Sequence, residues 1–159
     1  MRTVKVKVSE AGNAALNWAA AIAMGWHDVQ ITGYDDPDSE EEVFFRPAKV
    51  VGGRQVSGSG VRWNPTNNLE QGSAILFEHR ISIHFCTDLR ERNRQYVHAE
   101  CGTNSHHGYS DGHDKPLVAG IRCLVKSKLG EVIEVPLQLV NKAEYQLGNH
   151  PRASESPRG

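Results

Sequence analysis

Hydrophobic and polar residues alternate at the start of the chain and then change to a helical period. In residues 3–8, Val4, Val6 and Val8 alternate with polar side chains, the period of two expected for a strand with one buried face. In residues 10–24, apolar side chains recur instead at every third or fourth position. The pattern therefore predicts a strand followed directly by an amphipathic helix.

The residues around this helix indicate its ends. Ser9 is expected to cap its first turn, and Gly25 is expected to end it in a left-handed conformation. The predicted buried face holds Leu16, Ala19, Ala20 and Ala23, with Trp18 and Ile22 beside it.

The middle third predicts short elements separated by turns. In chain order they are a strand at Val29 and Ile31, an acidic surface loop at 35–42, two strands at 43–45 and 49–51 pairing around Gly52 and Gly53, a turn at 57–60, a strand at 61–63 and a second, shorter helix within 67–80. Ile81, Ile83 and Phe85 then alternate with polar residues as a strand, residues 96–99 are expected to be its neighbour, and residues 100–114 to form a polar loop.

The clearest helical pattern comes late in the chain. Pro116 suits a first helical turn, Asp114 is expected to act as its cap or first-turn anion, and Gly130 ends the segment. Its apolar stripe is Leu117, Ile121, Leu124 and Val125. A short edge segment at 132–135 is expected to follow.

Together these elements predict a single α+β domain over residues 1–140, with a flexible tail at 141–159. We expect a small layered α/β sandwich in which a mostly antiparallel sheet is packed by two or three helices. The 159 residues, 38% of them hydrophobic, suffice for one such core.

Charge and cysteine content narrow the function classes. A net charge of -1 disfavours non-specific nucleic-acid binding, which depends on clustered Lys and Arg. No apolar run resembles a signal peptide or a membrane span, so we expect a cytoplasmic protein without a membrane partner. Three cysteines, Cys86, Cys101 and Cys123, are an odd count at irregular spacing and are expected to be reduced thiols.

Histidines and cysteines also offer a weak candidate for metal chemistry. Imidazole and thiolate are zinc ligands, and His98 with Cys101 has the spacing of half a site, but no second close pair completes it. The set is His84, Cys86, His98, Cys101, His106, His107 and His113. We predict no metal, no cofactor and no catalytic residue, and interpret the set as solvated or core-lining side chains. The Gly and Ser segments at 52–53 and 57–60 lack a phosphate-loop pattern and are interpreted as turns.

Three blocks of sequence resemble the NinX-type proteins of phages. Residues 4–6 with ALNWA at 15–19 resemble the family's strand and its "ALDWAVA" helix, and WNPTNNLEQG at 63–72 resembles "YSPSTDWAQGG". PLVAGIRCLVKSKLG at 116–130, followed by Glu134, Val135 and Pro136, is similar to "PLIAAMRCYVASKLG" and its acidic-Val-Pro ending. The resemblance implies a phage or prophage accessory protein with a fold akin to small α-β-α sandwiches. Asn68 and Leu69 stand where the family has Asp and Trp.

A second group of residues has the chemistry of a binding site. An indole offers a stacking face, Asn and Thr side chains both donate and accept hydrogen bonds, and an Arg can grip phosphate or carboxylate. The predicted ligand-binding residues are Trp63, Asn64, Thr66, Asn67, Asn68 and Arg122. The alternative is structural, because the same Asn, Pro and Thr residues suit a turn and a helix cap, Trp63 suits a core and Arg122 suits a helix flank.

Two classes of function stay open. The first is a non-enzymatic phage accessory protein that sequesters a small nucleotide-like host defence molecule or docks on a host factor. The second is a small metal-dependent hydrolase using the His and Cys residues of 98–113. A homo-oligomer that acts only through protein contacts is a further reading.

Overall fold

The computed structural model describes residues 2–32, 44–51, 54–57, 63–102 and 106–140. Its elements are β1 (Thr3–Lys7), α1 (Asn13–Ala23), β2 (His27–Thr32), β3 (Phe44–Val51), β4 (Arg54–Ser57), α2 (Leu69–Glu78), β5 (Ser82–Asp88), β6 (Arg94–Cys101), β7 (His106–Asp111), α3 (Pro116–Leu129), β8 (Val132–Pro136) and a 3-10 turn, η1 (Leu137–Leu139). The predicted acidic loop at 35–42 and the tail at 141–159 lie outside the described residues.

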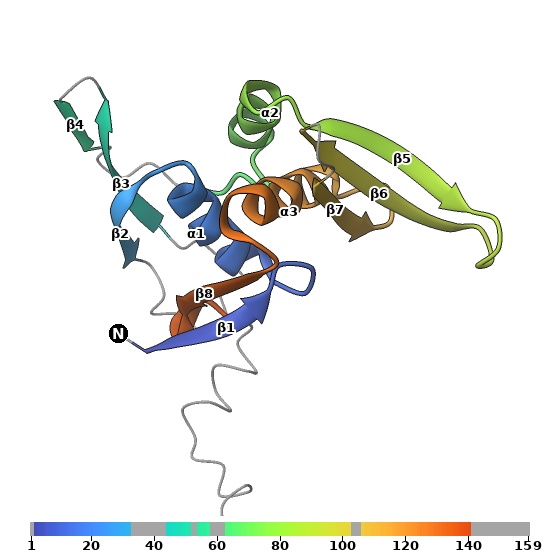
Figure 1. The fold of residues 1–159 in the computed structure, drawn as a ribbon, viewed down its shortest axis with the longest axis horizontal. Coiled ribbons are helices and arrows are strands. Elements are labelled where there is room, and N and C mark those ends of the chain that lie inside the picture. The colour runs from blue at the N-terminus through green and yellow to red at the C-terminus, as the bar shows by residue number, and fades with distance from the viewer. Residues whose placement is uncertain (1, 33–43, 52–53, 58–62, 103–105, 141–159) are drawn as a thin grey trace, which may run out of the picture.

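The strands form three antiparallel sheets around the helices, which confirms the α+β class. β1 pairs with β8, β2-β3-β4 form the second sheet and β5-β6-β7 form the third. Figure 1 shows α1 and α3 in the middle of the molecule, with the β5-β6-β7 sheet and the β2-β3-β4 sheet on opposite sides of them. The strands thus divide among three separate sheets rather than one.

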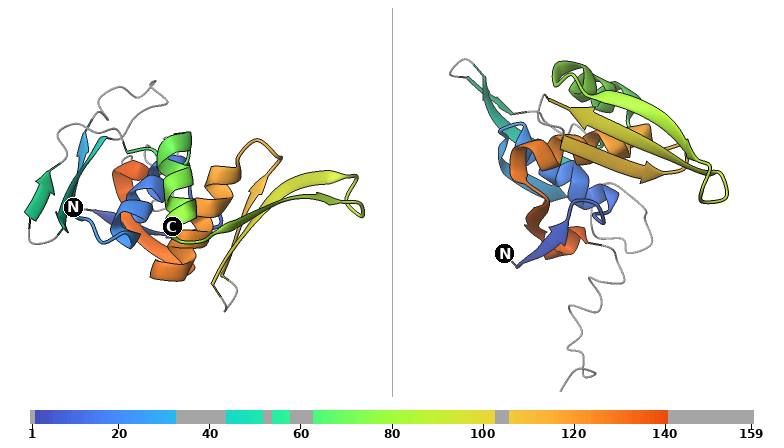
Figure 2. Two further views of the ribbon diagram at one scale, coloured as in Figure 1. Left: turned by 90° about the horizontal axis from the view of Figure 1, so that it is seen from above. Right: turned by 45° about the vertical axis from the view of Figure 1, so that its right-hand side comes forward.

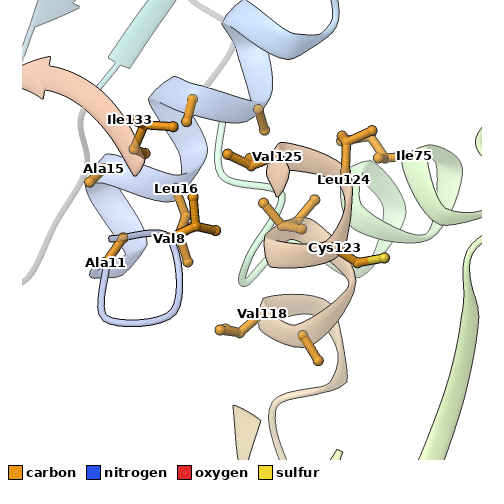
Figure 3. Packing of buried hydrophobic residues seen from close by; sticks show 14 of the residues in the cluster. Val8, Ala11, Ala15, Leu16, Ile75, Val118, Cys123, Leu124, Val125 and Ile133 are labelled. Carbon is orange, nitrogen blue, oxygen red and sulfur yellow. The ribbon is translucent and has the colours of Figure 1, made fainter. Parts of the chain in front are cut away.

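The core lies between α1 and α3, where small and branched apolar side chains interlock (Figure 3). Leu16 of α1 and Ile121 and Val125 of α3 have no exposed surface. The alanines of α1 let the two helices approach closely, because a methyl group occupies little space between two backbones. The predicted apolar face of α3 is therefore confirmed, whereas that of α1 is buried at Leu16, Ala19 and Ala20 and only half-buried at Ala23.

The ends of the helices show which local signals act. Gly25 has φ of 83°, and the N–H groups of Gly25 and Trp26 donate to the carbonyls of Ile22 and Ala21, a left-handed helix end that was predicted. The predicted cap at Ser9 is wrong, because residues 8–10 form turns and α1 begins only after Gly12. The predicted cap at Asp114 is also wrong, because Lys115 holds the position before Pro116.

Two predictions for the strands need correction. The segments predicted to pair around Gly52 and Gly53 lie on one strand, β3, and the partner across those glycines is β4. Trp63 lies in no strand.

The predicted polar loop at 100–114 is also wrong, because it contains β7 and the end of β6. The residues of β7 that face α3 are Gly108 and Ser110. Both are buried, but neither has a large apolar side chain, so the sequence shows no alternation of hydrophobic and polar residues.

The β5-β6-β7 sheet has one covered face and one open face. Val97, Ala99 and Gly108 point toward α3 and are buried. Figure 2 shows α3 on this face and, among the described elements, none over the other. An antiparallel sheet tolerates this arrangement, since alternate side chains meet core and solvent.

Within the described residues, none of the helices has the length and hydrophobicity needed to cross a membrane.

Candidate functional site

Most of the predicted ligand-binding group is organised around a buried side chain of α1, Asn17. The Asn17 side chain is 5% exposed. Its Nδ2 donates to Asn64 Oδ1 at 2.8 Å, and its Oδ1 accepts from the backbone N–H of Thr66 at 3.0 Å. Its backbone carbonyl accepts from Trp63 Nε1 at 2.8 Å. One buried asparagine thus anchors the segment that precedes α2.

The polar side chains of this segment also bond to one another. Asn64 Oδ1 accepts from Thr66 Oγ1 and from Asn67 Nδ2, both at 3.3 Å, and the Asn64 N–H donates to Gln71 Oε1 at 2.7 Å. Asn68 caps α2 by accepting from the Gln71 N–H at 2.9 Å. Asn and Asp cap helices equally well, so Asn68 can replace the family's Asp here.

Trp63 is part of the interior. Its side chain is 7% exposed, and its ring centroid lies 4.3 Å from that of Trp26 at an interplanar angle of 51°. The indole N–H is bonded to Asn17 and the indole ring contacts another indole. Both its polar and its apolar surface therefore contact protein.

Arg122 bonds to a different part of the molecule. From α3 its Nη1 donates to the Tyr109 carbonyl of β7 at 2.6 Å, and its Nη2 donates to the Ala11 carbonyl at 3.2 Å. Its Nε is buried and has no hydrogen-bond partner among the residues that the structure describes. Burial lowers the pKa of the guanidinium, while the charge of Asp111 opposes that shift.

The structure therefore brings Trp63, Asn64, Thr66 and Asn67 together around Asn17. Among the described residues, no hydrogen bond joins Arg122 to that network. A ligand-binding role for the group stays a prediction, and each of these contacts also fits the structural alternative.

The strand pleat separates the two residues of the weak half-site for a metal, His98 and Cys101. His98 and Cys101 are three residues apart on β6, so their side chains lie on opposite faces of the sheet. His98 and His107 share the open face, whereas Cys101 is buried toward α3. His113 Nε2 lies 2.8 Å from the Cys86 carbonyl. Over the described parts of the chain, no three His, Cys, Asp or Glu side chains converge as a metal site.

The two buried cysteines lie against each other beneath the sheet. Cys101 Sγ and Cys123 Sγ are 3.0 Å apart, and the side chains are 7% and 0% exposed. Burial raises the pKa of Cys123, and the hydrogen bond to Cys101 raises it further. Cys123 therefore stays a neutral thiol at neutral pH.

The open face of the sheet carries a row of aromatic and imidazole rings. Antiparallel pairing places His84, His98 and Tyr109 directly beside one another across three strands. The next residues on this face are Tyr96 of β6 and His107 of β7. We call these five residues the ring face.

The rings lie nearly parallel to one another. The centroids of His98 and Tyr109 are 4.9 Å apart at 15°, and those of His98 and His107 are 4.9 Å apart at 21°. His84 lies 5.7 Å from His98 at 28°. Tyr109 is 48% exposed, so the array is open to solvent at its β7 edge.

Charged groups of both signs lie at one end of the ring face, where Arg94 pairs with Glu91 at 3.3 Å as well as with Asp111. Arg94 Nη2 lies 2.7 Å from Asp111 Oδ1, and Arg94 also lies over the Tyr96 ring, 5.9 Å from its centroid. The Arg94 hydrogen bond, with further attraction from Arg122 and Lys115, lowers the pKa of Asp111. Three cations thus surround one carboxylate.

The imidazoles of the ring face are held in hydrogen-bonding geometry. His98 Nε2 and His107 Nδ1 are 2.6 Å apart, so one ring donates to the other. Burial, and then the charges of His107 and His84, lower the pKa of His98, while Glu100 opposes the shift. The His98 ring is therefore largely neutral at neutral pH, and the array offers flat faces with polar edges.

Sequence reasoning noticed the histidines of this face but not Tyr96 and Tyr109. The available signal was the alternation of Arg94, Tyr96 and His98, which places these side chains on one face of a strand. Recognising the whole face required the pairing of β6 with β7, which was not predicted.

The comparisons address the identity of the chain. A comparison with curated proteins finds no match. The family model described as "Bacteriophage P22, NinX" matches residues 7–128, a span that includes α1, the Asn17-anchored segment, the ring face and almost all of α3. Because this match covers well over half of the sequence, the chain belongs to the NinX family of phage proteins.

Proposed function

We propose that this phage protein is a non-enzymatic binding protein that sequesters a small nucleotide-like molecule in the cytoplasm of the bacterial host. The ligand class is a host defence-signalling nucleotide, such as an ADP-ribose or cyclic nucleotide. The observation that carries the proposal is the ring face, an open array of nearly parallel rings on a sheet whose other face is packed on α3.

The chemistry of the ring face suits a nucleobase with an attached phosphate. A base can stack on Tyr109 and His98, since every base offers a π face to an aromatic side chain. Imidazole nitrogens can donate to or accept from its polar edges. Arg94 and Lys115 lie at the end of the array, where their charged groups can donate hydrogen bonds to a phosphate.

The hydrogen bonds of the histidines support binding rather than catalysis. His98 is paired with His107, and His113 with a backbone carbonyl. Among the described residues, no hydrogen bond joins a histidine ring to a serine hydroxyl or a cysteine thiol, the arrangement that activates a nucleophile. The half-site of His98 and Cys101 does not support the hydrolase alternative, because the two side chains lie on opposite faces of the sheet.

The proposal is tested by titrating the purified protein with ADP-ribose and with a cyclic dinucleotide. Calorimetry and thermal shift are expected to show saturable binding, and native mass spectrometry a co-purified small molecule. Tyr109→Ala is expected to weaken binding roughly 5- to 150-fold, the equivalent of about 1–3 kcal/mol for one lost stacking contact.

Phe77→Ala is the matched control for this experiment. Phe77 is 88% exposed on α2, so its replacement removes an aromatic ring outside the ring face. Its affinity should equal that of the unchanged protein. Absence of both a bound molecule and a thermal shift would end the proposal. Normal binding by Tyr109→Ala together with loss in Asn67→Ala would instead place the ligand at the Asn17-anchored segment.

Docking on a host protein is the second candidate function. Leu69 and Phe77, 72% and 88% exposed on α2, are the observation that favours it. Phe77→Ala should then abolish a host complex that Tyr109→Ala leaves intact. Light scattering of the purified protein measures its molar mass, which distinguishes docking on a host protein from self-association of the chain.

A further inference from the structure

The buried thiol pair beneath the ring face is unused by the proposed function. Cys101 ends β6, and Cys123 lies in the middle of α3, so the pair bridges the sheet and the helix packed on it. Their Sγ atoms are 3.0 Å apart, about 1 Å more than a disulfide bond of roughly 2.05 Å. The two sulfurs would therefore have to approach by only about 1 Å to be joined.

The third cysteine cannot take part in this pairing. Cys86 lies opposite Tyr96 on the open face of the sheet, whereas Cys101 points to the α3 face. The sheet itself separates the two sulfurs. A disulfide within the chain can therefore form in one combination of thiols without rearrangement of the strands.

We propose that Cys101 and Cys123 are an oxidisable dithiol, which a small peroxide converts to an intrachain disulfide that cross-links β6 to α3. The inference is independent of the proposed ligand. It rests on the distance between the sulfurs, on their burial and on the separation of Cys86 from them.

The unequal burial of the two thiols sets the order of the steps. Cys101 is slightly exposed and Cys123 is not, so peroxide reaches Cys101 first. The Cys101 sulfur attacks one peroxide oxygen, the O–O bond breaks, and the leaving hydroxide takes the thiol proton to form water, leaving a sulfenic acid. Cys123 then attacks the Cys101 sulfur, and its proton leaves with the sulfenic oxygen as a second water. Two thiols lose two electrons, and one peroxide is reduced to two waters.

The test uses the full chain with Cys86→Ser, so that only the pair can react. After treatment with hydrogen peroxide and removal of the excess, intact mass spectrometry is expected to show a loss of two hydrogens. Titration of the denatured product should find no free thiol, and peptide mapping without reductant should join the peptides of Cys101 and Cys123. Because both thiols are buried, the reaction should be slower than oxidation of an exposed thiol.

A second variant separates pairing from general oxidation. Cys86→Ser with Cys101→Ser leaves Cys123 alone, and its mass should stay unchanged under the same treatment. Unfolding of the oxidised Cys86→Ser protein in urea should need a higher concentration than unfolding of the reduced form, because the cross-link restricts the unfolded chain. Addition of oxygen atoms to the pair, retention of both thiols or a covalent dimer in place of the intrachain bond would each overturn the inference.

Discussion

At the scale of single residues, Asn17 decides how the segment before α2 is held. A buried amide that lost its protein partners would destabilise the fold, because water cannot reach its donors and acceptor to replace the lost hydrogen bonds. Here Asn64 and Thr66 satisfy the side chain, and Trp63 bonds to its carbonyl. The polar group therefore specifies one docking position of this segment on α1.

Replacing this amide should be costly. Asn17→Ala leaves the buried Thr66 N–H without its acceptor and removes the shortest of the hydrogen bonds that Asn64 Oδ1 accepts, so the free energy of unfolding should fall by about 1–3 kcal/mol. Urea denaturation followed by tryptophan fluorescence measures it, since Trp63 is bonded to the same residue. Asn13→Ala, at an exposed position of α1, is the control and should change the free energy of unfolding little. Equal losses in the two variants would refute the anchoring role of Asn17.

At the scale of elements, the contact between β7 and α3 supports the ring face from below. A Cβ added at Gly108 would meet the Ala119 carbonyl and would lie 2.5 Å from the backbone N of Cys123. These atoms belong to a helix backbone, which cannot move away as a flexible side chain would. Glycine is therefore required for β7 to lie against α3, and Tyr109 lies next to this contact.

Gly108→Ala should push β7 away from α3. Overpacking typically costs about 1–3 kcal/mol, and a contact with backbone belongs at the upper end of that range. The melting temperature should fall, and nucleotide binding at Tyr109 should weaken with it. Gly12→Ala is the matched control, because nothing lies within 4 Å of its added Cβ. A melting temperature of Gly108→Ala equal to that of Gly12→Ala would show that β7 and α3 are farther apart than described.

At the scale of the whole molecule, helices shield one face of the β5-β6-β7 sheet and leave the ring face to solvent. The far end of the β5-β6 hairpin extends beyond the helices (Figure 1). The pKa of His98 on this face is lowered in the folded state, so the titration of His98 is coupled to the stability of the fold.

Stability should decrease as the pH falls below about 6.5. The folded state lowers the pKa of His98 from 6.5, through burial and the charge of His107, so the unfolded chain binds the proton more readily. Stability from this group is thus present above pH 6.5 and is lost as the pH falls toward the lower folded pKa. Urea midpoints measured between pH 7.5 and about 5 check this. His98→Gln should flatten part of the slope, and an unchanged slope in that variant would contradict the assignment to His98.

Local patterns predicted most of the elements. The alternation of Val4, Val6 and Val8 and the apolar stripe from Leu117 to Val125 each appear where expected, since burial of one face imposes its period on the sequence. The left-handed end at Gly25 follows from the chemistry of one residue. Three blocks of sequence also indicated membership of the NinX family, and the family match confirms it.

The candidate site depended on pairing that no local pattern records. β7 was not predicted because the residues that face α3 are Gly108 and Ser110. They allow β7 to lie close to α3 but lack the hydrophobic side chains that indicate a buried strand. Without β7 the ring face has no Tyr109, and His98 appears as an isolated imidazole.

The amino-acid sequence alone thus determined most of the helical and extended segments, with β7 as the main exception, because each period reflects burial within a few residues. Tertiary structure decided which side chains meet. Register across three strands placed His84, His98 and Tyr109 in one row, and packing of α3 on β6 brought Cys123 to Cys101. Contacts between residues distant in sequence arise from the packing of whole elements, so the identity of the neighbours is set only when the chain has folded.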